Sequence, residues 1–207
     1  MKLASIFFLS LLFIAGSAYP KEGTDSALGF GFGISKKEAL EIIRSRGKRI
    51  LEDTVDSKRI RTVVFDSTAV DLPLDTLDTE VKTSLEFYRD KLLSSSLLLK
   101  PKDPMKQEEL ESQLSEFLTA RYGEPVNREE VLNITAWTWH VDKVRVILSS
   151  DPGKNLLKVK YIYEPLNQAR REEELKQRQR GKPSDPAREM FIEGNYSAPY
   201  YLKENRQ

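Results

Sequence analysis

The sequence predicts an α+β protein in which helices pack on one face of an antiparallel sheet. Residues 35–47 and 104–123 carry apolar side chains at the three- and four-residue spacing of amphipathic helices. Residues 156–163 alternate between two faces, with Leu157, Val159, Tyr161 and Tyr163 on one and Lys158, Lys160 and Ile162 on the other. Such alternation is typical of an antiparallel sheet with one buried face and one largely hydrated face.

The first helix is predicted to begin at Ser35, since Glu38 stands three residues later in capping-box spacing. Gly47 is predicted to end it. Its apolar face comprises Ile34, Ala39, Leu40, Ile42 and Ile43.

Strands are expected next. Residues 60–66 are rich in β-branched side chains and predict a strand, and a second short strand is expected at 68–72. The acidic, proline-containing segment 71–80 predicts a loop. Residues 83–88 and 92–99 predict a hairpin that turns at 89–91.

The second half repeats this order. A helix is predicted after Pro104, and Gly123 followed by Pro125 is expected to end it. Its buried stripe comprises Leu110, Leu114, Phe117 and Leu118. Strands are predicted at 134–140, 143–148 and 156–163, the last two joined across 151–153.

The two halves, 34–100 and 101–165, are similar enough to indicate a tandem helix-plus-strands duplication, although short matches also arise by chance. A shift of 76 residues places identical or similar residues on each other: Gly47 on Gly123, Asp66 on Asp142, Leu85 on Tyr161, and Phe87 on Tyr163.

The two ends differ from the body. Residues 1–18 have the basic start, short apolar run and small-residue site of a cleaved secretory signal peptide. Residues 19–33 are glycine-rich and predict a flexible lead-in whose phenylalanines contact the core. Residues 166–207 predict a charged segment, either an exposed helix or disordered, followed by an extended aromatic tail.

Composition excludes several classes of protein. The chain has 33 Lys and Arg, 32 Asp and Glu, one His and no Cys among 207 residues. Removing the predicted signal leaves equal numbers of acids and bases, which argues against an electrostatic nucleic-acid binder. Without cysteine there is no disulfide, thiolate site or lipid anchor. Secretion without cysteine favours a bacterial periplasm or cell surface, and no later segment predicts a membrane span.

The sequence shows no catalytic constellation. His140 is the one imidazole, no Gly-x-Ser-x-Gly motif is present, and the acidic residues offer no distinctive pair. We therefore expect no enzyme activity, cofactor or metal. A secreted hydrolase that uses His140 or an acidic pair remains an alternative.

Aromatic side chains are the candidate binding residues. Trp137 and Trp139 share one strand face, either in the core or in a groove for a small ligand or glycan. In the tail, aromatic and apolar residues either fold back on the body or contact a partner; these are Met190, Phe191, Tyr196, Tyr200 and Tyr201.

The helix start Gly33-Ile34-Ser35-Lys36-Lys37-Glu38-Ala39, followed by tryptophan-bearing strands, resembles small bacterial envelope domains. These include the small lipoprotein subunit of the outer-membrane barrel-assembly machinery and the β-lactamase-inhibitor proteins. The resemblance covers 33–66 and, as a second copy, 105–163. It implies an α+β binding module without catalysis. The chain departs from both groups, because it lacks the lipidated cysteine of the first and the disulfides of the second.

Together these observations predict a secreted or periplasmic, non-enzymatic binding or assembly module that acts through protein–protein contacts in the cell envelope. Binding of a small ligand or glycan through Trp137 and Trp139 is the alternative.

Overall fold

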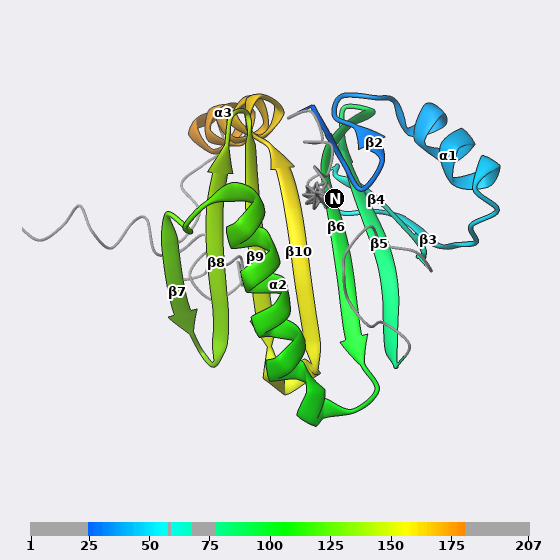
Figure 1. The fold of residues 1–207 in the computed structure, drawn as a ribbon. Coiled ribbons are helices and arrows are strands. Elements are labelled where there is room, and N and C mark those ends of the chain that lie inside the picture. Colours follow the sequence, from blue (N-terminus) through cyan, green and yellow to red (C-terminus); the bar gives the residue numbers. More distant parts are fainter. Residues whose placement is uncertain (1–24, 58, 68–77, 181–207) are drawn as a thin grey trace, which may run out of the picture.

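A computed structural model describes residues 25–57, 59–67 and 78–180 (Figure 1). Its main feature is an eight-stranded sheet in which all neighbouring strands are antiparallel, in the order β3-β4-β5-β6-β10-β9-β8-β7. The strands are β3 (Ile50–Val55), β4 (Arg61–Asp66), β5 (Thr79–Tyr88), β6 (Lys91–Pro101), β7 (Asn127–Val131), β8 (Ile134–Val141), β9 (Val144–Asp151) and β10 (Leu156–Tyr163). The helices are α1 (Lys36–Ser45), α2 (Gln107–Tyr122) and α3 (Glu164–Arg180).

The predicted α+β class is confirmed, and both halves contribute to one sheet. α1 precedes β3 to β6, and α2 precedes β7 to β10. The last strands of the two halves pair with each other, so that Leu97 of β6 lies opposite Val159 of β10. The core therefore continues across the boundary predicted at residue 100.

The shift of 76 residues fits this topology only in part. Gly47 and Gly123 both follow a helix with positive φ, +65° and +85°. Leu85 and Phe87 lie in β5, however, whereas Tyr161 and Tyr163 lie in β10, which by its position in the sheet corresponds to β6. The offset changes because β4 and β5 are separated by residues 67–78, whereas only two residues join β8 to β9.

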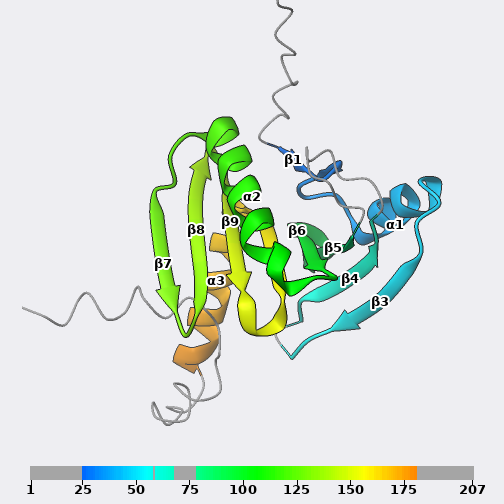
Figure 2. The same ribbon diagram turned by 60° about the horizontal axis from the view of Figure 1, so that its bottom comes forward.

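Helices α1 and α2 lie on the same face of the sheet, here called the front face (Figures 1 and 2). α1 buries Ala39 and Ile43 in a cluster with Phe65 and Leu85. α2 buries three residues of its predicted stripe, Leu110, Leu114 and Leu118, against β6, β8, β9 and β10. The fourth, Phe117, packs against this cluster but is only partly buried. The prediction that helices pack on one face is correct for these two helices.

Local signals explain the element boundaries. The Ser35 side chain accepts a hydrogen bond from the Glu38 amide, and the Glu38 carboxylate accepts one from the Ser35 amide, which completes the predicted capping box. The predicted hairpin of β5 and β6 turns at Arg89 and Asp90, whose φ angles are +51° and +62°. Positive φ at both central residues gives the turn the twist that antiparallel strands require.

Four short strands among the described residues were not predicted. Edge strands β3 and β7 flank the sheet, and residues 26–31, within the predicted flexible lead-in, form the hairpin β1 (Ser26–Ala27) and β2 (Phe30–Gly31). Phe30 is 1% exposed, and the ring of Phe32 stacks on Tyr163 at 5.5 Å, so these phenylalanines do contact the core as predicted. The short strand predicted at 68–72 lies outside the described residues.

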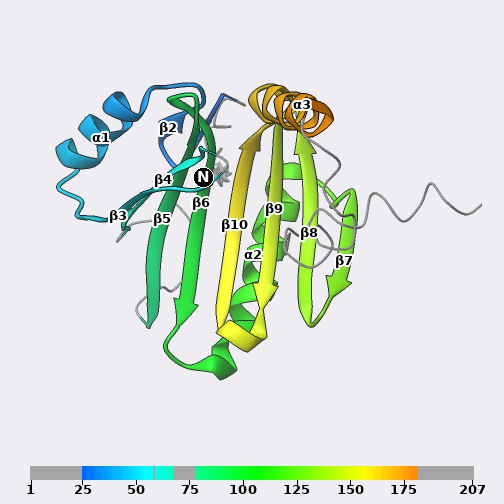
Figure 3. The same cartoon turned by 180° about the vertical axis from the view of Figure 1, so that it is seen from behind.

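Helix α3 stands at the rim of the opposite face, here called the back face (Figure 3). It begins directly after β10, and Leu166 packs against Ile60, Tyr88 and Leu93. Asn167 is 3% exposed, so the first turn of α3 is anchored rather than fully exposed. Within the described part of the chain, none of the helices combines the length and hydropathy needed to span a membrane.

Candidate functional site

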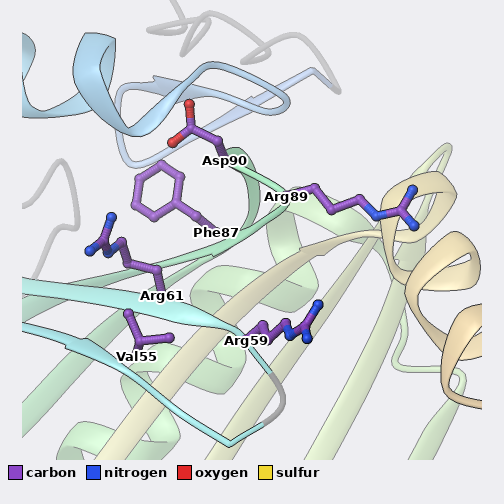
Figure 4. A pocket seen from close by; sticks show the side chains of 6 residues that line it. All are labelled: Val55, Arg59, Arg61, Phe87, Arg89 and Asp90. Carbon is purple, nitrogen blue, oxygen red and sulfur yellow. The ribbon is translucent and has the colours of Figure 1, made fainter. Parts of the chain in front are cut away.

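The strongest candidate site is a hollow of about 290 Å³ bordered by three arginines (Figure 4). We call it the arginine hollow; it is lined by Val55, Arg59, Arg61, Phe87, Arg89 and Asp90. It lies where β3 ends, β4 begins, and β5 turns into β6.

Sheet register places half of the lining residues in one row. Val55 of β3 lies opposite Arg61 of β4, which in turn lies opposite Phe87 of β5. Cross-strand neighbours share a sheet face, so these three side chains lie side by side on the front face. Phe87 is 1% exposed and belongs to the core, whereas Val55 is 56% exposed and offers apolar surface.

Two turns supply the other residues. Arg59 has a φ of +61° in the connection between β3 and β4, and Arg89 and Asp90 form the turn between β5 and β6. Figure 4 shows the Arg59 and Arg89 side chains extending toward α3, whereas the Arg61 side chain extends the other way. Guanidinium groups therefore lie on both sides of the hollow.

The three arginines differ in their partners. Arg61 Nε lies 3.4 Å from Asp53 Oδ1, and an Arg89 guanidinium nitrogen lies 2.6 Å from Glu173 Oε2 on α3. Arg59 is exposed and attracts the Glu173 carboxylate, but among the described residues its guanidinium makes no ion-pair or hydrogen-bond contact. Each guanidinium presents planar donors that match a carboxylate or phosphate, and the donors of Arg59 make no hydrogen bond to a described side chain.

The Glu173 carboxylate links this corner to α3. It accepts a hydrogen bond from the Tyr88 hydroxyl and pairs with Arg89. The hydrogen bond from Tyr88, followed by the attraction of Arg89, lowers the pKa of Glu173. Burial, followed by the same hydrogen bond, raises the pKa of the Tyr88 hydroxyl. The Tyr88 hydroxyl therefore stays protonated and donates to the Glu173 carboxylate. The ion pair with Glu173 in turn positions Arg89 beside the hollow.

A second polar cluster lies at the centre of the back face. Lys160 Nζ donates to both oxygens of Glu86, at 2.9 and 2.7 Å, and Ser94 Oγ donates to Glu86 at 2.7 Å. Burial alone raises the pKa of Glu86, but attraction to Lys160 together with these hydrogen bonds outweighs burial and lowers it. The cluster therefore contains an ion pair between Glu86 and Lys160 on the surface of the sheet.

The two predicted tryptophans lie in the core. Trp137 is 7% exposed and Trp139 is 1% exposed, both in the cluster that packs under α2. Trp139 Nε1 donates to the carbonyl oxygen of Gly123 at 2.8 Å, and Arg128 lies 5.3 Å above the Trp137 ring. Neither indole presents a face to solvent, because α2 covers the front of β8, so the groove expected there is not formed.

The remaining predicted residues contribute no described site. His140 is exposed on the back face opposite Arg145. The five predicted tail residues, Met190, Phe191, Tyr196, Tyr200 and Tyr201, lie outside the described residues. No group of three or more carboxylate or imidazole side chains suited to a metal ion occurs among the described residues.

No protein-family model matches the chain, and searches of curated proteins and of solved structures found no significant match. The fold and the arginine hollow are therefore the observations on which a function can be based.

Proposed function

We propose that this protein is a non-enzymatic binding module of the bacterial cell envelope that binds an extended acidic segment of a partner protein at the arginine hollow. The observation that carries the proposal is the pair of opposed guanidinium groups, Arg59 and Arg61, on either side of an apolar floor. The predicted signal peptide supports the location.

The guanidinium groups that line the hollow favour an acidic ligand. The lining offers an acidic ligand three guanidinium groups against one carboxylate. Two of the arginines already have carboxylate partners, but Arg61 holds Asp53 at 3.4 Å and both side chains are more than a third exposed. Such exposed pairs contribute little stability, so an incoming carboxylate can replace Asp53 at low cost.

The shape of the hollow favours a peptide over a single small anion. The guanidinium of Arg61 extends away from those of Arg59 and Arg89. The exposed side chain of Val55, at the end of β3, offers apolar surface in the same hollow. An extended segment with acidic side chains on both sides of an apolar residue would reach both groups and cover Val55. Aliphatic contact at the centre with charged contact at the rim is the usual arrangement of a protein interface.

Titration with a defined probe tests the proposal. Hexaglutamate is added to protein labelled with ¹⁵N at the arginine side chains, and the Nε–Hε resonances are followed. We expect the resonances of Arg59 and Arg61 to move together. We also expect Arg59→Gln to weaken binding about ten-fold, the loss of one charge-assisted contact. Arg44→Gln is the matched control, because Arg44 is exposed on α1 outside the hollow.

Two results would overturn the proposal. One is an equal loss of affinity in the Arg44 and Arg59 variants, which would show general attraction to a polyanion. The other is movement of resonances other than those of the hollow. For the natural partner, a photo-crosslinking residue at position 55 should capture a protein from envelope extract, and Arg59→Gln should abolish that capture.

We also propose that the two halves arose by tandem duplication. The repeated order of one helix and four antiparallel strands supports this, as does the central pairing of β6 with β10. Deletion of residues 67–77 from the longer β4–β5 connection should leave a folded protein, because β8 and β9 are joined by two residues alone. An unfolded product would contradict the equivalence of these two hairpins.

A further inference from the structure

Lys158 lies at the centre of the back face, whereas Val55, Arg61 and Phe87 of the arginine hollow lie on the front face. β10 is the middle of the sheet, between β6 and β9, and no described helix crosses the back face at this point (Figure 3). The register places Leu98 of β6 on one side of Lys158 and Ser149 of β9 on the other.

The charge of Lys158 is only partly compensated within the described chain, by attraction to the Glu86 carboxylate. The side chain is partly buried and makes no ion pair or hydrogen bond with a described residue. The nearest acid that acts on it, Glu86, is already held by Lys160 and Ser94. Burial, followed by repulsion from Lys160, lowers the pKa of Lys158 below its ordinary value.

Hydroxyl groups without partners lie around this ammonium. Ser96 of β6 is 1% exposed, and its Oγ has no hydrogen-bond partner. Ser96 lies opposite Lys160 on β10, and Lys158 is the next residue of β10 on the same face. Such diagonal neighbours are within reach of a long side chain such as that of lysine. Ser149, directly beside Lys158, is half-buried, and its hydroxyl makes no hydrogen bond with a described side chain. Buried polar groups in proteins are normally paired, so the Ser96 hydroxyl indicates a missing acceptor.

We propose that the back face binds a carboxylate between β6, β10 and β9, with Lys158 as its counter-ion and the Ser149 and Ser96 hydroxyls as further donors. The carboxylate comes from outside this chain, either from an acidic side chain of a protein or from a small dicarboxylic acid. Both sources offer an acceptor-only group with two oxygens, which suits one ammonium and two hydroxyls. The ligand neutralises a charge that folding alone leaves partly desolvated.

The test uses the full chain with ¹³C at the lysine Cε atoms, whose chemical shift reports the protonation of each ammonium. The Lys158 resonance is assigned as the one missing in Lys158→Met. Without ligand, Lys158 should titrate at a lower pH than the exposed lysines. Succinate should move the Lys158 resonance selectively and raise the midpoint of its titration, and a glutamate-containing tripeptide should do the same if proteins can supply the group.

Three variants make the test specific. Lys158→Met should abolish the response to succinate, whereas Lys100→Met, which removes an exposed lysine from β6, should leave it unchanged. Ser149→Ala should weaken succinate binding about five-fold, the loss of one neutral hydrogen bond. Arg59→Gln should have no effect, which separates this site from the arginine hollow.

Two outcomes would overturn the proposal. If Lys158 titrates above the exposed lysines in the ligand-free chain, a carboxylate of the chain itself already compensates it. If neither probe moves the Lys158 resonance, or if Lys100→Met reduces the response as much as Lys158→Met, no such site exists.

Discussion

The indole nitrogen of Trp139 on β8 donates a hydrogen bond of 2.8 Å to the carbonyl oxygen of Gly123, the residue that ends α2. This bond ties the end of the helix to the strand that it covers. Trp139 is also among the largest fully buried side chains.

Trp139→Phe should therefore lower the free energy of unfolding by about 2 kcal/mol, from a lost hydrogen bond and a small cavity. Denaturation in urea measures the change. Trp137→Phe is the control, because Trp137 is 7% exposed, and its replacement should cost about 1 kcal/mol by lost area alone. Equal costs for the two variants would contradict a special role for the bond to Gly123.

Gly123 itself should tolerate alanine poorly. Its φ of +85° and ψ of −170° lie in a region that residues with a Cβ rarely adopt. A Cβ there would meet no atom within 4 Å, so the expected cost of about 2 kcal/mol is a backbone cost and not a steric one. Gly47→Ala, at a φ of +65° after α1, should cost about 1 kcal/mol. The same urea experiment compares the two, and a neutral Gly123→Ala would show that the helix end rearranges freely.

The Glu86–Lys160 pair should make stability depend on pH. Because the pKa of Glu86 is lowered in the folded state, its ionisation stabilises the fold above its unfolded-state pKa. That contribution is lost as the pH falls through the folded-state pKa. Glu86→Gln should lower the free energy of unfolding at pH 7 by about 2 kcal/mol, since Lys160 loses its partner. The difference from the unaltered protein should shrink below about pH 4.

Thermal unfolding between pH 3 and pH 7 measures this effect. Glu130→Gln is the control, because Glu130 is exposed on the edge strand β7, and its curve should run parallel to that of the unaltered protein. A Glu86→Gln curve that also runs parallel would show that Glu86 has the same pKa in the folded and unfolded states.

The turn between β7 and β8 should accept a stabilising substitution. Leu132 is 88% exposed and has a φ of +50°, a conformation that is unfavourable for leucine. Leu132→Asn should raise the free energy of unfolding by about 0.5–1 kcal/mol, because asparagine tolerates this conformation. Leu132→Ala removes the same apolar surface but keeps the unfavourable backbone. Equal stability of the two variants would show that backbone strain is absent.

Sequence patterns predicted the elements whose signals are local. The capping box at Ser35 and the leucine stripe of 110–118 located both front-face helices, and the alternation of 156–163 placed Lys158 on the face opposite Val159. Strands β3 and β7 escaped prediction because they are edge strands with charged side chains on both faces. Their pairing with β4 and β8 makes them strands, and neither has an alternating pattern of its own.

The candidate sites could not be predicted, because sheet order creates them. Arg59, Arg61 and Arg89 are spread over 31 residues, and they border one hollow because β4 lies between β3 and β5. The sequence places Lys158 on a polar face but does not show that Glu86 forms its ion pair with Lys160. Conversely, the spacing of Trp137 and Trp139 was predicted to fit either a groove or the core, and the position of α2 decides for the core.

The pairing of β6 with β10 has a consequence for aggregation. β6 is an eleven-residue strand of mostly leucine and serine, and it is covered on both edges by β5 and β10. If the first half were made alone, one full edge of β6 would be open to pair with another copy. Among the described residues, the edge strands are instead β3 and β7, which carry Glu52, Asp53, Arg128, Glu129 and Glu130. Each half thus protects the other from self-association, and the two should be soluble only together.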